Sequence, residues 1–202
     1  MLHVKPSELR SYADTLRLAS GRTLTVRFVE PEDAERLQAY FRSLARPSHY
    51  NRFLAAVQEL PRSELERILK IGEERRFAVI AELNVDGRPA IVGEARYAFD
   101  RTMRTVEFGM SISDAWHRLG IGTALMANLE CRAAAFGAER MFGEALRSNE
   151  PMIALARKMG FSFKNATDDW RLLRFEKQIG RAIEDIPCGG SRRVAAAYAV
   201  AG

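Results

Sequence analysis

The sequence predicts an α/β (α+β) protein with one hydrophobic core. Segments in which apolar and polar residues alternate, as in a half-buried strand, are interspersed with segments whose apolar residues repeat every three to four positions, as in an amphipathic helix. Their expected order along the chain is β, β, α, α, β, β, β, α, β, α, β, β. The chain has 202 residues, 47% of them hydrophobic, which is enough for one well-packed domain.

The first third of the chain predicts a hairpin followed by two helices. Residues 15–18 and 23–29 alternate on either side of Ser20-Gly21-Arg22, a pattern typical of a hairpin. A helix is expected to begin near Pro31, because acidic residues follow at its positive end. Its apolar stripe is Ala34, Leu37, Phe41 and Leu44. Residues 46–60 are aromatic and basic with little periodicity, so an irregular or short-helical segment is expected there, before a second helix over 64–71.

The middle of the chain predicts three strands and a helix. Strands are expected over 77–83, 90–99 and 105–113, and the first two are joined by a turn that contains Asp86-Gly87. In the third strand Val106, Phe108, Met110 and Ile112 alternate with polar or small residues. A turn with two glycines follows, and from Thr123 the apolar residues repeat with helical spacing as far as Gly137.

The last third predicts a strand, a helix and two further strands. The strand covers 140–146, Asn149 caps the next helix, and Gly160 ends it. Strands over 161–164 and 170–176 complete the expected fold. Residues 178–202 include Pro187-Cys188-Gly189-Gly190 and an alanine-rich end, and are expected to form a mobile tail.

The turn between the third central strand and its helix is typical of a phosphate site. The first amides of a helix have no intrahelical partner, and the helix dipole makes that end positive. The nucleotide-triphosphate loop is excluded because no lysine follows Gly122. The dinucleotide fingerprint lacks its third glycine, since residue 125 is Leu125, although Glu144 lies at about the right distance for its acidic residue.

Two blocks of sequence resemble the GCN5-related N-acetyltransferase (GNAT) superfamily. His117-Arg-Leu-Gly-Ile-Gly122 is similar to the family's Gln/Arg-x-x-Gly-x-Gly/Ala turn, with His117 as a departure. Residues 149–163 are similar to its later Asn-x-x-Ala-x-x-Leu-Tyr-x-x-x-Gly-Phe block. The resemblance implies a mixed central sheet of about seven strands, splayed in the middle and flanked by about four helices. It places the acetyltransferase domain at residues 23–177, after an N-terminal extension and first hairpin strand at 1–22.

The resemblance also implies acetyl-CoA as co-substrate, held in the gap of the splayed sheet. The residues implied to bind it lie on the third central strand, on the turn and at the later cap: Met110, Ile112, Arg118, Leu119, Gly120, Ile121, Gly122, Thr123 and Asn149. A backbone N–H between Met110 and Ile112 would stabilise the oxyanion. No metal is expected.

Glu107 is the predicted general base for an attacking amine, because strand parity places it with Gly109 and Ser111, where there is room for substrate. The alternative is an ion pair between Glu107 and Arg96. Glu94 and Glu144 are second candidates for the base and are more typical of structural roles. The family's usual general-acid tyrosine falls on Ala156, so either the thiolate leaves unassisted or Ser148 is the acid.

The expected reaction is acetyl transfer to a primary amine. The motifs together are similar to the acetyltransferase domain of bacterial protein-lysine acetyltransferases, which modify AMP-forming acyl-CoA synthetases. A small-molecule amine or antibiotic as acceptor, and a non-catalytic acyl-CoA-binding module, are the alternatives.

The basic residues that give the net charge of +5 are scattered and not interleaved with aromatics, so no nucleic-acid partner is expected. No apolar run of about 20 residues and no leader-like segment occur, so no membrane association is expected. The two cysteines predict no disulfide framework, which suits a cytoplasmic protein.

Overall fold

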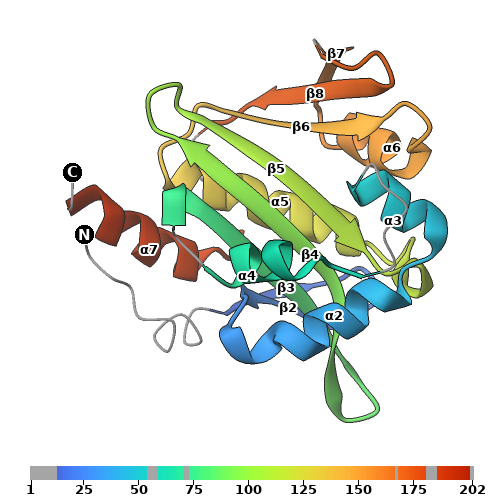
Figure 1. The fold of residues 1–202 in the computed structure, drawn as a ribbon. Coiled ribbons are helices and arrows are strands. Elements are labelled where there is room, and N and C mark those ends of the chain that lie inside the picture. The colour runs from blue at the N-terminus through green and yellow to red at the C-terminus, as the bar shows by residue number, and fades with distance from the viewer. Residues whose placement is uncertain (1–12, 54–58, 71–72, 167, 181–185, 201–202) are drawn as a thin grey trace.

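The computed structural model describes residues 13–53, 59–70, 73–166, 168–180 and 186–200. Within them the chain forms one eight-stranded mixed sheet in the order β1-β2-β3-β4-β5-β6-β8-β7 (Figure 1). The strands are β1 (Asp14–Arg17), β2 (Thr23–Phe28), β3 (Arg76–Val85), β4 (Arg88–Asp100), β5 (Thr105–Ile112), β6 (Arg140–Leu146), β7 (Ser162–Asn165) and β8 (Leu172–Gln178). The predicted α/β fold is confirmed, with the eight strands of the expected order, one more than the seven or so that the family resemblance implied.

Helices cover both faces of the sheet. Figure 1 shows α2 and α4 in front of the strands and α5 behind them. The helices are α2 (Ala34–Ser43), α3 (Arg46–Phe53), α4 (Arg62–Leu69), α5 (Ile121–Ala135), α6 (Glu150–Lys158) and α7 (Gly189–Val200). None of the described helices is long and apolar enough to cross a membrane. The two that were not expected as regular helices are α3, in the segment that lacked periodicity, and α7.

Two hydrophobic clusters hold these layers together. Residues of β3 alternate between them: Val79 and Ala81 face the cluster under α5, while Ala78 and Ile80 face the cluster under α2 and α4. Because both faces of β3 are buried, its sequence reads as a continuous apolar run and not as an alternation. Strand β5, on the far side of β4, keeps the alternation, since one of its faces borders open space near Glu107.

The sheet divides between β5 and β6. These strands run parallel, and their register pairs only Thr105 with Arg140, Val106 with Met141, and Glu107 with Phe142. On its other side β5 stays paired with β4 along its whole length, up to Ile112. Beyond Glu107 the two strands therefore separate, and helix α3 contacts both of them near the opening.

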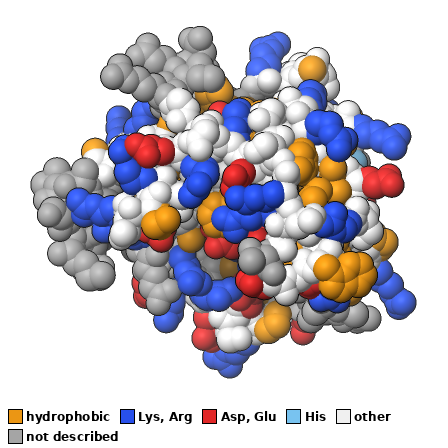
Figure 2. Space-filling model, turned by 90° about the horizontal axis from the view of Figure 1, so that it is seen from above, with side chains coloured by type: hydrophobic (Ala, Val, Ile, Leu, Met, Phe, Trp, Pro, Cys, Tyr) orange, Lys and Arg blue, Asp and Glu red, His pale blue; other side chains and the backbone are white. Residues whose placement is uncertain are grey.

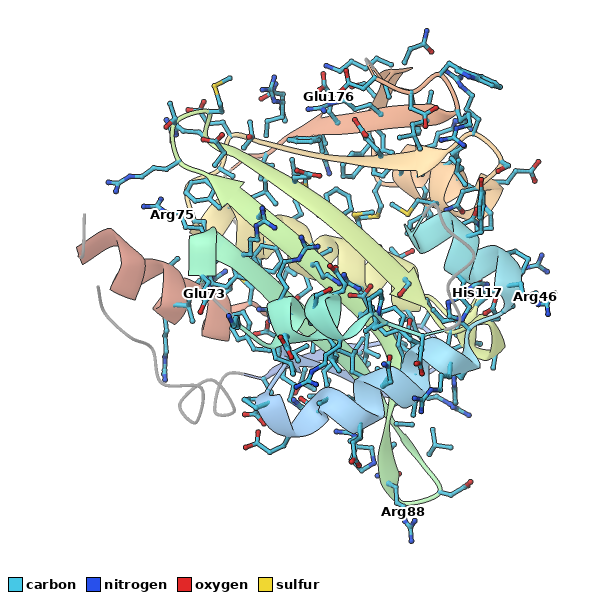
Figure 3. The ribbon with its side chains drawn as sticks, in the orientation of Figure 1. Arg46, Glu73, Arg75, Arg88, His117 and Glu176 are labelled. Atoms are coloured by element: carbon cyan, nitrogen blue, oxygen red, sulfur yellow. A yellow bond between two sulfur atoms is a disulfide. The ribbon has the colours of Figure 1, made fainter. Side chains whose placement is uncertain are left out.

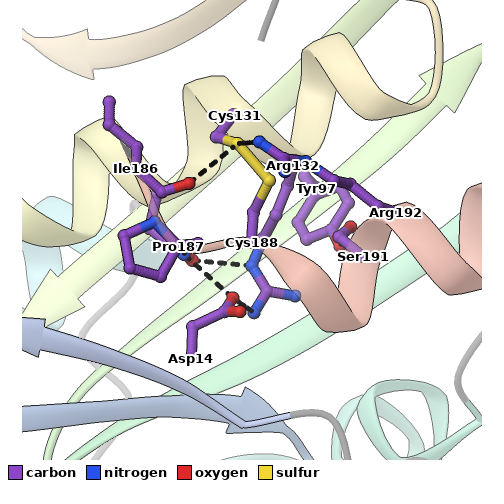
Figure 4. Close-up of a disulfide and its surroundings, with 10 residues drawn as sticks. Asp14, Tyr97, Cys131, Arg132, Ile186, Pro187, Cys188, Ser191 and Arg192 are labelled. Atoms are coloured by element: carbon purple, nitrogen blue, oxygen red, sulfur yellow. Dashed lines mark hydrogen bonds and ion pairs between the residues drawn. A yellow bond between two sulfur atoms is a disulfide. The ribbon is translucent and has the colours of Figure 1, made fainter. Parts of the chain in front are cut away.

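Sequence reasoning expected no ordered element after residue 177, but the structure has α7 there, packed on α5. Cys188, Ser191 and Val194 are buried in this contact. Cys188 also forms a disulfide with Cys131 of α5 (Figure 4). The expectation of no disulfide was wrong because the two positions are 57 residues apart in sequence and meet only when α7 folds back. Cysteine usage therefore no longer supports a reducing compartment.

A buried polar cluster lies beside the disulfide and joins the first strand to the last helix. The guanidinium of Arg132, which is 0% exposed, pairs with the carboxylate of Asp14 in β1. Asn128 donates to Asp14 at 3.0 Å and to the carbonyl of Pro187, and accepts from Arg132 at 2.6 Å (Figure 4). Because each buried charge has an opposite charge and hydrogen bonds, the cluster can stay ionised inside the protein.

Candidate active site

The turn before α5 has the backbone that a phosphate-binding helix start requires. Gly120 is the N-cap with φ of 83°, a conformation that glycine adopts at little cost, and a Cβ there would meet no other atom. Arg118 also has positive φ, at 63°. Gly122 serves packing instead, because a Cβ there would lie 3.1 Å from Leu155 and 3.2 Å from Ile112. The first glycine shapes the turn, and the second lets α5 approach α6 and β5.

His117 fixes this turn against the end of β5. Its Nε2 donates to the carbonyl of Ile112 at 2.9 Å, and the amide of Trp116 donates to Ser113 at 2.8 Å. Asp114 connects the same turn to α3, since its carboxylate accepts from the Ala45 amide at 2.9 Å and from the Ser48 hydroxyl at 2.7 Å. Burial alone would raise the pKa of Asp114, but these hydrogen bonds outweigh it and hold the pKa below its usual value.

Beyond the end of its ladder with β6, strand β5 turns backbone groups toward the gap that no described strand pairs. The amide of Ser113 bonds to Val92 of β4, so by alternation the groups of Ser111 also face β4. Those of Met110 and Ile112 therefore face the β6 side, where the ladder has ended. The Ile112 carbonyl is used by His117, which leaves the Met110 amide and carbonyl and the Ile112 amide directed into the gap. Of the range expected to supply an oxyanion donor, Ser111 is thus directed away.

A cavity of about 720 Å³ lies between α4 and the sheet, and is called here the α4 cavity. It opens where β5 and β6 diverge, because Glu107, Phe108 and Gly109 form part of its floor. Its charged lining consists of three acids and three arginines: Glu64, Glu107, Glu144, Arg67, Arg76 and Arg96.

Glu107 differs from the other acids of the α4 cavity. It is exposed, and within the described part of the chain its carboxylate has no ion-pair partner. The alternative pairing with Arg96 is not found, since Arg96 bonds to Glu64 at 2.5 Å and to Glu94 at 3.1 Å. Glu144 pairs with Arg174 at 3.3 Å. The acid at the point of divergence is therefore available to a ligand.

Glu94 belongs to a buried hydrogen-bond chain that sequence reasoning missed. Its carboxylate is 2% exposed and accepts from the Ser111 hydroxyl at 3.2 Å as well as from Arg96. The Ser111 hydroxyl in turn bonds the Tyr40 hydroxyl at 3.0 Å. Strand parity placed Ser111 on this face, but nothing in the sequence of α2 indicated that Tyr40 reaches β5. These hydrogen bonds connect α2 to β5 beside the gap. Glu94 therefore has the surroundings of a structural residue, as expected, and not those of a base.

Comparison with known proteins agrees with this geometry. The sequence profile of the Acetyltransferase (GNAT) family matches residues 38–161, more than half of the chain. The chain belongs to this acetyltransferase family. It is 28% identical over 152 residues to Acetyltransferase PA5475 of Pseudomonas aeruginosa, an alignment that covers 75% of this chain and 82% of the relative.

Solved structures show the same GNAT fold. The GNAT domain of S. lividans PAT superposes with a TM-score of 0.74 and 23% identity, covering 83% of this chain and 97% of that one. A cAMP-binding acyltransferase from Mycobacterium smegmatis superposes with a TM-score of 0.62 and 19% identity, covering 97% of this chain and 59% of that one. At these identities the likeness concerns the fold alone.

The later GNAT block lies in α6 and the residues before it. Asn149 caps the helix, its side chain accepting from the Met152 amide at 3.2 Å. Ser148 is exposed in the preceding turn and does not line the α4 cavity. Ala156, at the family's tyrosine position, is fully buried in the core beneath α5 and α6.

The remaining predicted cofactor residues divide into exposed and packed positions. Arg118 is exposed, and Thr123 is half-buried with its hydroxyl accepting from Lys158 at 3.4 Å. Leu119 packs against the core and Ile121 lies inside it, so these two could contact a ligand only through their backbone. In the described residues no group of three or more His, Cys, Asp or Glu side chains is placed to hold a metal.

Proposed function

We propose that this protein transfers an acetyl group from acetyl-CoA to a primary amine, most specifically to a lysine side chain of another protein. The observation that carries the proposal is the position of Glu107: exposed, without an ion pair among the described residues, and at the place where β5 leaves β6. Two further features fit acetyl-CoA. The left-handed turn at Gly120 presents helix amides to a pyrophosphate, and Met110 presents unpaired backbone groups to the gap.

In the proposed reaction Glu107 accepts a proton from the acceptor ammonium, because only the neutral amine can attack a thioester. The amide of Met110 or Ile112 donates to the carbonyl oxygen as negative charge develops on it. A C–N bond forms, the C–S bond breaks, and the electron pair leaves with the CoA sulfur. The nitrogen loses its second proton to water or to the departing thiolate, which gives a neutral amide. A thiolate leaves without help because a thiol has a moderate pKa, so the buried Ala156 needs no substitute.

The charged lining favours a protein acceptor over a small hydrophobic amine. The α4 cavity is open and carries six charged side chains, whereas a site for a small apolar amine would be closed and aromatic. Figure 2 shows Lys and Arg side chains spread over the face seen from above, with acidic side chains between them. Two large aromatic side chains are also exposed, Tyr50 of α3 at 42% and Trp170 before β8 at 81%, and exposed aromatics are typical anchors for a protein partner.

Glu107→Gln tests the chemistry. We expect the rate of thiol release at neutral pH to fall by roughly 10²–10⁴, the usual contribution of a positioned base. The deficit should shrink at high pH, because more of the acceptor lysine, with a reference pKa of about 10.4, is already neutral. Glu144→Gln is the matched control, since it removes a cavity acid that already has a partner. Equal rates for wild type and Glu107→Gln would remove Glu107 from the mechanism.

Trp170→Ala tests the class of acceptor. With protein acceptors, including an AMP-forming acyl-CoA synthetase, kcat/KM should fall, while with an Nα-blocked lysine amide it should stay unchanged. A preference for polyamines or aminoglycosides over every protein offered would instead support the small-amine alternative. Binding of acetyl-CoA with no turnover of any acceptor would support a non-catalytic module.

Ser148→Ala tests whether departure of the thiolate needs an acid. The variant should retain full turnover, and a large loss would make Ser148 the general acid.

A further inference from the structure

A second cavity lies at the other end of the sheet, under the β4–β5 hairpin, and is called here the hairpin cavity. Its volume is about 330 Å³. The lining combines three arginines, two aromatic rings and two small residues: Arg75, Arg101, Arg104, Phe99, Phe136, Gly137 and Ala195. Among these described lining residues there is no acid. Figure 3 shows Arg75 and His117 at opposite ends of the sheet, so this cavity is remote from the acetyl-CoA turn.

The length of α5 separates the two places. Gly120 precedes its first residue, and Phe136 and Gly137 follow its last. The helix has 15 residues, which at 1.5 Å per residue corresponds to about 22 Å. A ligand of the hairpin cavity would therefore not be the pyrophosphate end of acetyl-CoA held at the turn.

Two of the three arginines are without ion pairs. Arg104 is engaged, because its guanidinium donates to the Gly137 carbonyl at 3.3 Å and pairs with Glu139 at 2.5 Å. This accounts for Arg104 as a cap at the C-terminal end of α5. Arg75 and Arg101 form no ion pair within the described part of the chain. Two positive charges thus border the cavity without an ion-pair partner among the described residues.

The backbone at this cavity is unusual. Arg75, the last residue of the 3-10 helix η2 (Glu73–Arg75), has φ of 57°, and Arg104 has φ of 49°. Side chains with a Cβ are disfavoured in this left-handed region, where glycine or asparagine would be less strained. Elsewhere in the described part of the chain, the non-glycine residues with positive φ are Asp86, in a hairpin turn, and Arg118, in the turn before α5. The guanidinium of Arg104 already has a use as a cap, so Arg75 is the residue whose left-handed backbone calls for another explanation, and a role for its guanidinium supplies one.

The aromatic rings complete the chemistry. Phe99 and Phe136 are half-buried, with ring centroids 5.8 Å apart, and offer an apolar surface beside the arginines. A guanidinium fork matches the oxygens of a phosphate, and aromatic side chains stack on flat rings. The volume is in the range of small-molecule sites. We infer that the hairpin cavity binds a small ligand that carries both a phosphate and a planar ring, of the class of the nucleoside monophosphates.

Calorimetric titration of the full chain with AMP tests this inference, with desulfo-CoA present at saturation so that the turn before α5 is filled. AMP should bind, and adenosine and inorganic phosphate should each bind at least roughly tenfold more weakly, because each lacks one half of the contacts. Added salt should weaken the binding, since the contact depends on charge. No AMP binding, or phosphate binding as tightly as AMP, would overturn the inference.

The double variant Arg75→Gln/Arg101→Gln locates the site. We expect its affinity for AMP to fall by roughly 10- to 100-fold, as charge-assisted hydrogen bonds are lost. Arg88→Gln is the matched control: Arg88 is an exposed arginine at the β3–β4 hairpin (Figure 3), and its loss should leave AMP affinity unchanged. Retained affinity for desulfo-CoA reports that each variant is folded. If the double variant binds AMP as wild type does, the ligand lies elsewhere and the inference is wrong. The test does not depend on acetyl transfer.

Discussion

The α4 cavity and the hairpin cavity contain the same number of arginines but differ in their acids. In the α4 cavity Arg67, Arg76 and Arg96 lie among three glutamates. In the hairpin cavity Arg75, Arg101 and Arg104 lie among aromatic rings, with no acid in the described lining. A balanced lining can accept an ammonium and remove its proton, whereas a cationic lining can only hold an anion.

The difference extends to which groups are already paired. In the α4 cavity the arginine Arg96 is shared between Glu64 and Glu94, and the group without an ion pair among the described residues is an acid, Glu107. In the hairpin cavity the groups for which the described part of the chain supplies no ion pair are cations, Arg75 and Arg101. Pairing by the rest of the protein, more than the count of charges, thus decides what each cavity offers to a ligand.

The largest expected effect is on stability and concerns the buried polar cluster around Arg132. This cluster lies beneath α7, the helix whose Ala195 lines the hairpin cavity. Arg132→Ala should lower the free energy of unfolding by roughly 3–5 kcal/mol, because it leaves the Asp14 carboxylate buried without a counter-charge. Urea unfolding measures the loss. The double variant Arg132→Met/Asp14→Leu should lose less, since no charge then remains unpaired. Glu107→Gln should unfold nearly as wild type does. If Arg132→Ala and Glu107→Gln lose equal amounts of stability, the distinction between a stabilising cluster around Arg132 and an unpaired acid in the α4 cavity is wrong.

The disulfide gives the next largest effect. Replacing Cys131 and Cys188 by serine should cost roughly 2–4 kcal/mol, because the bridge closes a loop between residues 57 apart in sequence. AMP affinity should also fall, as α7 forms one wall of the hairpin cavity, while acetyl-CoA affinity should be retained. A reductant should shift the melting temperature of the wild type and leave that of the double variant unchanged. If reduction of the disulfide leaves AMP affinity unchanged, AMP binding does not depend on the packing of α7 against α5.

Gly120→Asp should remove the stabilisation that acetyl-CoA provides, about 2.7 kcal/mol at a ligand concentration one hundred times the Kd. A side chain and a negative charge would occupy the phosphate position. Gly87→Asp is the matched control, because Gly87 has φ of 80° and equal open space but lies in the β3–β4 hairpin. Both variants should lose a similar amount of stability without ligand. If the melting temperature of Gly120→Asp still rises with acetyl-CoA, the turn is not the binding site.

The smallest expected effect is the pH dependence of the contact between Asp114 and α3. Because the folded-state pKa of Asp114 is lowered, its contribution to stability is present above the ordinary carboxyl pKa of about 3.9 and is lost as the pH falls through the folded value. Ser48→Ala removes one hydrogen bond to the carboxylate, so the pKa should move up toward its ordinary value. A carboxyl NMR titration measures both. An unchanged pKa in Ser48→Ala would show that the Ser48 hydroxyl does not help to lower it, and that the Ala45 amide and the nearby His117 do so without it.

The sequence predicted the fold class, the central strand-turn-helix unit and its family. Local patterns carry this information: alternation in β5, the glycine turn, and the cap at Asn149. The role of His117 could not be predicted, because its bond to Ile112 depends on how the turn folds back. The pairing of Arg96 with Glu64 could not be predicted for a similar reason, since Glu64 is 32 residues away on a helix that covers the sheet. Contacts between distant segments leave no local pattern.

The cluster around Arg132 also bears on how the chain is made. Asp14 leaves the ribosome first, Asn128 and Arg132 follow more than a hundred residues later, and Pro187 and Ser191 come later still. Asn128 obtains its bond to Pro187, and the Tyr97 hydroxyl its bond to Ser191 at 3.4 Å, only when this last segment has emerged. The sheet and the turn before α5 are complete in sequence before that. During synthesis the sheet and this turn can therefore form before α7 is present to exclude water from the polar cluster.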